Sequence, residues 1–165
     1  MKKGTLLVEI MIASAIFSFV GIVALLVIKV ADEAWTIDAR YLGLQQQLRS
    51  SVGGMIREIR QAKKETGRDL TVAADFESIQ FFIPGISTPV QYYVQGGKLV
   101  REHPPNSLTV LANDITQLGF CCVGGASCID CAGASQVQIH IEGSKVLRGR
   151  AALYELDEKA VLRNE

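Results

Sequence analysis

The sequence predicts an α+β fold in which one long N-terminal α-helix packs on an antiparallel β-sheet. Three observations lead to this fold class. The stretch from Gly4 to Ile28 is apolar almost without interruption. Apolar residues then recur at helical spacing as far as Ile59, and from Asp69 onward they alternate with polar residues at a period of two. The 165 residues are enough for this helix and one domain with a core of modest size.

The apolar stretch is long enough to cross a membrane. A helix from Thr5 to Ile28 is about 36 Å long at about 1.5 Å per residue, and the hydrocarbon core of a bilayer is about 30 Å thick. Lys2 and Lys3 precede the stretch, which favours a cytoplasmic N-terminus. Glu9 is the one charged residue in it. Because an unpaired carboxylate inside a membrane costs several kcal/mol, we expect Glu9 to be functional and to have a partner.

The residues around Glu9 resemble a known processing signal. The segment GTLLVEI, residues 4–10, resembles the class III signal of type IV prepilins and type II secretion pseudopilins. The resemblance implies that a prepilin peptidase cuts between Gly4 and Thr5, N-methylates Thr5, and leaves Glu9 as the fifth mature residue. In a filament, the new α-amine of Thr5 and the Glu9 carboxylate of an adjacent subunit would neutralise each other. The chain departs from the family at Thr5, where most members have phenylalanine, and in its short leader of residues 1–4.

Two other interpretations of the apolar stretch stay open. An ordinary secretory signal peptide has a shorter apolar region, of about 7–15 residues, and a small-residue cleavage site. This stretch is longer, and the polar region after Ile28 offers no such site. The other interpretation is a plain membrane anchor that carries Glu9 by chance.

After Ile28 the helix is expected to continue to about Lys64 with one buried apolar face. Gly53 and Gly54 are expected to loosen or bend it, and Gly67 is expected to end it. The Leu and Ile heptads are irregular, which leaves a coiled-coil seam as the weaker alternative. The residues expected on the buried face are Trp35, Leu42, Leu48, Val52, Met55, Ile56 and Ile59.

From Asp69 the alternating pattern predicts a meander of antiparallel strands. Gly96-Gly97 and Gly143-Ser144 are expected to be hairpin turns, and residues 103–106 a loop. Val137, Ile139 and Ile141 are expected to face the core, with polar residues on the opposite, solvated face of that strand. The expected strands lie at residues 79–83, 90–94, 98–101, 108–112, 115–123, around 136–142, and 146–156.

The strand segments add to the resemblance. Residues 78–82, 91–94, 97–101 and 111–115, together with the ending at 162–164, are similar to minor pseudopilins of the J type and to their PilW-like pilus relatives. The expected organisation is a leader at residues 1–4, a membrane-spanning or filament-core helix at 5–28, an amphipathic helix at 29–66 and a periplasmic β domain at 67–165.

The four cysteines, Cys121, Cys122, Cys128 and Cys131, are clustered. Outside the membrane, in an oxidising compartment, such an even set indicates disulfides. Neighbouring residues on a strand point to opposite faces, so Cys121 and Cys122 are each expected to pair with Cys128 or Cys131, and either combination is open. A structural zinc site, a redox C-x-x-C motif and unpaired structural cysteines are the alternatives.

The sequence offers no catalytic pattern. It has no phosphate-binding loop, no G-x-S-x-G and no His-rich metal motif. His103 and His140 are expected to be solvated, and so are Asp114 and Asp130, which lack the ligand series of a calcium site. Without the leader the chain has 15 basic and 17 acidic residues, a balance that does not favour nucleic-acid binding. We therefore expect no enzyme activity, no cofactor and no metal.

These observations favour a minor pilin or pseudopilin that primes or caps a type IV pilus or a type II secretion pseudopilus. The resemblance implies an inner-membrane protein with a periplasmic domain, whose partners are the prepilin peptidase and the N-terminal helices of other pilins. One alternative is a single-pass, membrane-anchored periplasmic binding protein that does not polymerise. A weaker one is an exported thiol-redox enzyme.

Overall fold

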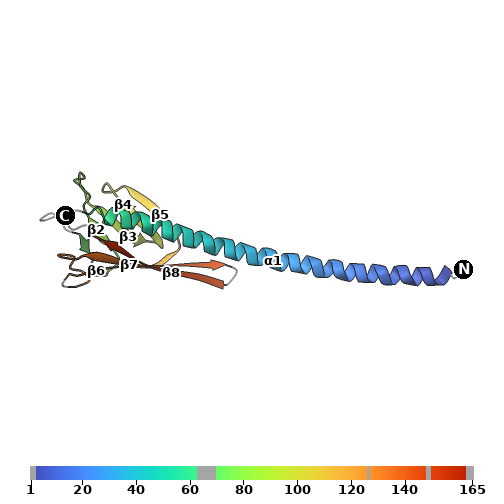
Figure 1. The fold of residues 1–165 in the computed structure, drawn as a ribbon. Helices are drawn as coiled ribbons and strands as arrows, with labels where there is room; N and C mark the ends of the chain where they lie inside the picture. Colours follow the sequence, from blue (N-terminus) through green and yellow to red (C-terminus); the bar gives the residue numbers. More distant parts are fainter. Residues whose placement is uncertain (1–2, 63–69, 126, 148–149, 163–165) are drawn as a thin grey trace. The chain divides into compact units, whose positions relative to one another are not determined.

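The computed structural model describes residues 3–62, 70–125, 127–147 and 150–162. The helix α1 (Lys3–Ile59) comes first, and all the strands follow it (Figure 1). The chain divides into two units, Met1–Arg40 and Tyr41–Glu165. The described part of the first unit is helix alone, whereas the second unit contains the rest of α1 and all the described strands.

Helix α1 is continuous through Gly53 and Gly54, the two glycines that were expected to loosen or bend it. It ends at Ile59, earlier than the expected Lys64. The chain tightens there, because the amides of Gln61 and Ala62 donate to carbonyls only three residues back. Lys64 and Gly67 lie outside the described residues.

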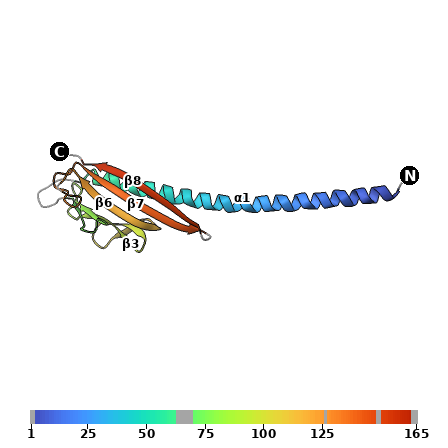
Figure 2. The same cartoon turned by 90° about the horizontal axis from the view of Figure 1, so that it is seen from below.

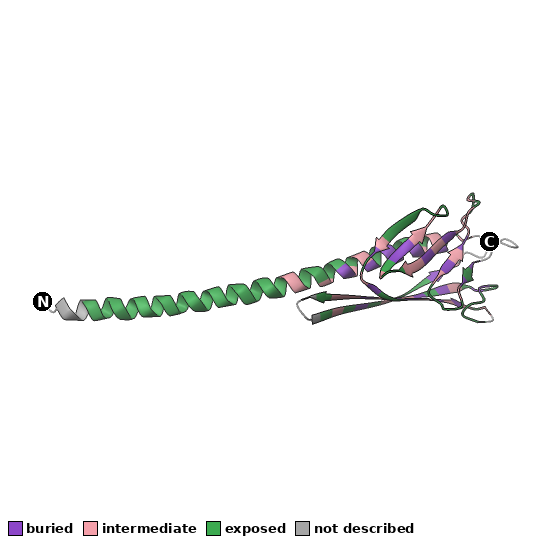
Figure 3. Ribbon diagram, turned by 180° about the vertical axis from the view of Figure 1, so that it is seen from behind, coloured by how far each residue is buried: buried purple, intermediate pink, exposed green. Residues whose placement is uncertain are grey.

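The buried face of α1 begins at Leu44 and continues through Leu48, Val52, Met55 and Ile59. Figure 3 shows this change from exposed to buried along the helix. The expected face was wrong at both of its first positions, since Trp35 is 75% exposed and Leu42 is 60% exposed. Leu42 precedes Leu44 by two residues, which is about 200° around a helix with 3.6 residues per turn, so it lies on the opposite side. Trp35 belongs to the first unit, ahead of the buried face.

The first sheet has five antiparallel strands in chain order. Gly96 and Gly97 both have positive φ and form the expected two-residue turn between the third and fourth strands. The first strand was not predicted, because two residues are too few to show alternation. The strands are β1 (Thr71–Val72), β2 (Ile79–Phe81), β3 (Val90–Gln95), β4 (Lys98–Glu102) and β5 (Leu108–Ala112).

The second sheet has three longer strands, which lie side by side in Figure 2. They are β6 (Ile115–Val123), β7 (Gln136–Leu147) and β8 (Arg150–Val161). On β7 the expected alternation is confirmed, since Val137, Ile139 and Ile141 are buried. The strands therefore form two sheets, where the alternating pattern alone had suggested a single meander.

The hairpin turn expected at Gly143-Ser144 is wrong. Strand β7 continues past both residues, and Gly143 pairs with Ile115 on one side and Tyr154 on the other. A Cβ atom on Gly143 would lie 3.0 Å from the Leu48 Cδ1 atom and 3.3 Å from the Leu44 Cδ1 atom. The glycine thus permits close packing of α1 on β7 and does not mark a turn. The closing strand is accordingly 150–161, later than the expected 146–156.

Within the second unit, α1 contributes to one core with the inner faces of both sheets. Polar bonds reinforce this packing at several strands. Ser51 Oγ donates to the Leu111 carbonyl on β5 at 2.9 Å, and Arg49 Nε donates to the Tyr154 hydroxyl on β8 at 2.9 Å. The expected α+β fold, a long helix packed on antiparallel sheet, is confirmed.

Candidate functional site

The N-terminal part of α1 presents an exposed apolar surface. Every large apolar side chain from Leu7 to Val30 is exposed, from 42% for Val23 to 81% for Phe17. By length and composition this helix can cross a membrane. Exposed apolar surface on this scale is rare in soluble monomers, which is consistent with a single-pass membrane anchor.

The polar side chains in this segment differ in how they are satisfied. Ser14 Oγ donates to the Met11 carbonyl at 2.9 Å, and Ser18 Oγ donates to the Ser14 carbonyl at 2.8 Å. Such local bonds let hydroxyl groups enter an apolar environment at low cost. Glu9 is exposed and has no hydrogen bond or ion pair among the side chains that the structure describes. Glu9 thus differs from the two serines, whose hydroxyl groups are bonded within the helix.

Gly4 and Thr5, the residues of the expected cleavage site, lie in the first turn of α1 as the structure has it. Their side chains are outside the description. No protein-family model matches the chain, and no curated protein matches it either.

The four cysteines form two disulfides, Cys121–Cys128 and Cys122–Cys131. This is one of the two combinations that the sequence left open. All four sulfur atoms are used, so none of these cysteines is a free thiol in this structure. The second disulfide is buried and belongs to the core. Together they hold the loop after β6, where Gly125 packs so closely on the Asp130 carbonyl that a Cβ atom would have no room.

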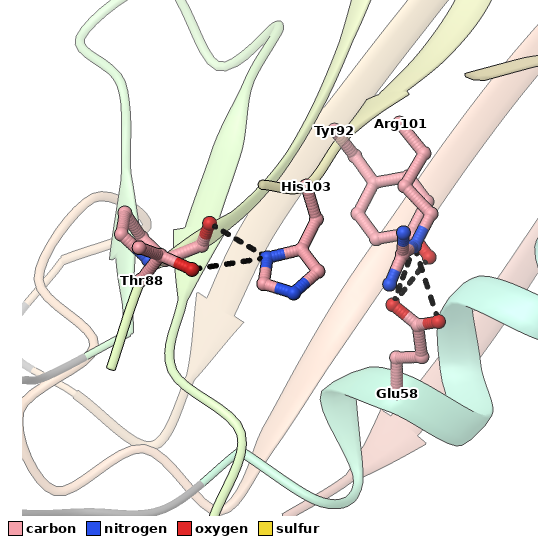
Figure 4. Close-up of polar contacts among 6 residues, drawn as sticks. Glu58, Thr88, Tyr92, Arg101 and His103 are labelled. Carbon is pink, nitrogen blue, oxygen red and sulfur yellow. Dashed lines mark hydrogen bonds and ion pairs between the residues drawn. The ribbon is translucent and has the colours of Figure 1, made fainter. Parts of the chain in front are cut away.

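A part-buried polar cluster fastens the end of α1 to the first sheet (Figure 4). Arg101 Nε on β4 donates to both carboxylate oxygens of Glu58, at 3.0 and 3.1 Å. The Tyr92 hydroxyl on β3 donates to Glu58 Oε2 at 2.9 Å. Burial, followed by the negative charge of Glu58, raises the pKa of Tyr92 well above its ordinary value. This cluster was not predicted from the sequence, because its three residues lie far apart in the chain and Glu58 differs from other helix acids only in preceding Ile59, which is buried.

The two histidines have different surroundings. His103 lies near the cluster of Glu58, Tyr92 and Arg101 (Figure 4). Its Nδ1 atom is 3.5 Å from the Thr88 hydroxyl and 3.5 Å from the Pro89 carbonyl. His140 is half-buried on the outer face of β7, 2.8 Å from Asp157 and 3.2 Å from Glu142. His140 keeps part of its exposure to solvent, as expected, but it also has carboxylate neighbours that were not predicted. These neighbours come partly from β8, a strand pairing that one sequence does not reveal. The hydrogen bond to Asp157 raises the pKa of His140, although burial acts in the opposite direction.

Asp130 is exposed and Asp114 is partly exposed, in line with the expected solvation, but each also has a partner within the protein. Lys145 Nζ donates to Asp114 Oδ2 at 2.9 Å. The Asp130 Oδ1 atom accepts a bond from the Ala132 amide at 3.0 Å within the disulfide-bonded loop. Asp114 therefore links its loop to β7, and Asp130 stabilises the backbone of the disulfide-bonded loop.

A shallow pocket of about 470 Å³ lies on the outer face of the second sheet, beside His140. Gly119 on β6 is directly opposite His140 on β7 and has no side chain to fill the space between the neighbouring side chains. Phe76, Gln138 and Lys159 are among the other residues that line this pocket.

Proposed function

We propose that this protein is a minor pilin-type subunit that is anchored in the inner membrane and joins a filament through α1. Its second unit, with the two sheets, would lie in the periplasm. The observation that carries the proposal is the exposed apolar segment of α1, whose single acid, Glu9, has no partner among the side chains that the structure describes. The subunit would prime or cap either a type IV pilus or a type II secretion pseudopilus.

The sequence of α1 restricts what can neutralise Glu9. Between Lys3 and Lys29 the chain has no basic residue. A parallel helix of the same kind therefore offers a positive charge near Glu9 only at its N-terminus. Cleavage between Gly4 and Thr5 would create an α-amine about one helical turn from the level of Glu9, because four residues rise about 6 Å. Pairing of the two charges between neighbouring helices fixes both their register and their direction.

Free energy also favours this arrangement. A lone carboxylate at membrane depth costs several kcal/mol, whereas a hydrogen-bonded pair of opposite charges costs much less. Packing of the apolar side chains supplies most of the free energy of helix association. The pair made by Glu9 selects one register among many. The acid would thus act in assembly, not in membrane insertion.

Replacement of Glu9 tests this role. We expect Glu9→Gln and Glu9→Ala to leave the chain in the membrane fraction but to lower its share in sheared filaments about tenfold. Asp38→Asn is the matched control, since Asp38 is an exposed acid of the same helix beyond the apolar stretch, and it should assemble normally. Unchanged incorporation of both Glu9 variants would contradict the proposal.

The alternative function, a membrane-anchored binding protein that does not polymerise, makes the opposite prediction. It requires neither cleavage nor Glu9. An intact Met1 on the native chain, together with recovery of the protein free of any other apolar helix, would favour this anchor.

A further inference from the structure

The outer face of the second sheet gathers four side chains capable of binding a metal ion. His140 on β7 is paired with Asp157 on β8, and the next pair on the same face is Glu142 with Glu155. The His140 Nδ1 atom lies 2.8 Å from the Asp157 carboxylate and 3.8 Å from the Glu155 carboxylate. One ligand atom from each of His140, Glu155 and Asp157 lies within 4.8 Å of the other two.

The orientation of the imidazole is a second, separate observation. Its Nε2 atom lies 3.2 Å from Glu142 Oε1. The Nδ1 atom lies 2.8 Å from Asp157 Oδ1, to which it donates its proton. A metal ion bound at Nδ1 would take the place of that proton, while Nε2–H keeps its bond to Glu142. Histidines that bind metals in proteins almost always donate their second ring N–H in this way, which fixes the tautomer and strengthens the ligand.

The net negative charge of the group also favours a bound cation. Three carboxylates surround one imidazole, so the group is negative whether or not the imidazole is protonated. Among the described residues, the ion pairs of these carboxylates are all made with His140. The nearby lysines do not neutralise this negative charge. Lys145 is paired with Asp114, and Lys159 lies one residue pair further along the same face.

We propose that His140, Asp157 and Glu155 form a binding site for a divalent transition-metal ion of the zinc class, with Glu142 as the residue that positions His140. Zinc takes imidazole nitrogen and carboxylate oxygen at about 2.0–2.2 Å in a four-coordinate site. The side chains of Glu155 and Asp157 are 54% and 72% exposed, so they can rotate inward to reach these distances. Gly119, opposite His140, leaves the space of the adjoining pocket for a water molecule as the fourth ligand.

The ligand set also distinguishes between ions. Calcium takes 6–8 oxygen ligands and magnesium keeps several waters around one or two carboxylates. An imidazole with two carboxylates suits zinc and its neighbours in the transition series. The bound ion would link β7 to β8, the edge strand of this sheet.

Titration with zinc chloride tests the proposal. The full chain is used without a histidine tag, in detergent, with its disulfides intact and after dialysis against a chelator. Calorimetry should show one zinc ion per chain and no heat with calcium or magnesium. His140→Gln and Asp157→Asn should weaken zinc binding at least tenfold, and Glu142→Gln should weaken it by about 10–100-fold.

His103→Gln is the matched control, because His103 is the other histidine of the chain and lies outside the cluster. It should bind zinc as the unmodified protein does. Thermal unfolding without metal checks that each variant is folded, and zinc should raise the midpoint only in the proteins that bind it. No zinc binding, binding unchanged in His140→Gln, or preference for calcium would each overturn the proposal.

Discussion

Packing of α1 on β7 can be tested at Gly143 with a single methyl group. In Gly143→Ala, the new Cβ would lie 3.0 Å from Leu48 Cδ1, 3.3 Å from Leu44 Cδ1 and 3.3 Å from the Asp114 carbonyl oxygen. Carbon atoms in good contact are about 3.5–4.0 Å apart, so the helix side chains must shift. Overpacking of this kind costs about 1–3 kcal/mol, and the stiffer unfolded chain returns about 0.4–1 kcal/mol.

We therefore expect Gly143→Ala to lower the free energy of unfolding by about 1–2 kcal/mol. For a domain of this size that corresponds to a fall of about 4–8 °C in the thermal midpoint. The thermal midpoint is measured by near-UV circular dichroism of the tyrosines, on the full chain in detergent. Gly119→Ala is the matched control in the same sheet, since its Cβ would meet His140 Cβ at an ordinary 3.7 Å, and it should be neutral or slightly stabilising.

A double-mutant cycle separates the clash with the helix from other effects of the new methyl group. Leu48→Ala alone is expected to cost about 2–5 kcal/mol, because Leu48 is fully buried. In that background Gly143→Ala should cost little or even stabilise, since its methyl group enters the space that Leu48 leaves. Equal stability of Gly143→Ala and the unmodified protein, or an unchanged cost in the Leu48→Ala background, would refute the packing explanation.

Three further predictions concern the second unit. Glu58→Ala should lower the free energy of unfolding by about 2 kcal/mol, measured by urea denaturation, because it leaves the Arg101 guanidinium and the Tyr92 hydroxyl without their acceptor. Because the pKa of Tyr92 is raised in the folded state, stability should fall as pH rises above about 10, by up to about 1.4 kcal/mol per pH unit; Tyr92→Phe should flatten this fall in alkaline unfolding curves. Replacing Cys122 and Cys131 together with alanine should cost about 3–4 kcal/mol in the same assay, from the opened loop and the lost core contacts.

Matched variants show whether these effects are specific. Arg57→Ala, at an exposed position of the same helix turn, should change stability by less than about 0.5 kcal/mol. Tyr93→Phe, on the next residue of β3, should leave most of the alkaline fall in place. Removal of the more exposed Cys121–Cys128 bond should cost less than removal of the buried one. If any control variant equals its partner, the corresponding explanation fails.

Local patterns in the sequence predicted much of the fold. The apolar run and the helical spacing predicted α1, and the alternation on β7 predicted its buried face from Val137 to Ile141. The Gly96-Gly97 turn followed from turn chemistry alone. In each case the physical cause lies within a few residues, which is why it can be read from one chain.

The errors have non-local causes. Gly143 looked like a turn because the close approach of Leu44 and Leu48 is set by a helix about a hundred residues earlier in the chain. The carboxylate neighbours of His140 were missed because Glu155 and Asp157 reach it through the pairing of β7 with β8. Leu42 was placed on the buried face because apolar character does not tell which side of a helix meets the sheet. The choice between the two disulfide combinations likewise required the geometry of the loop.

The central proposal is that α1 is processed after Gly4 and joins other helices through the charge pair of Thr5 and Glu9. Mass spectrometry of the N-terminal peptide, from native protein taken from sheared filaments and from membranes, tests it most directly. The proposal predicts a chain that begins at N-methylated Thr5 in the filament fraction. A native chain that keeps Met1–Gly4 and is absent from filaments would contradict it.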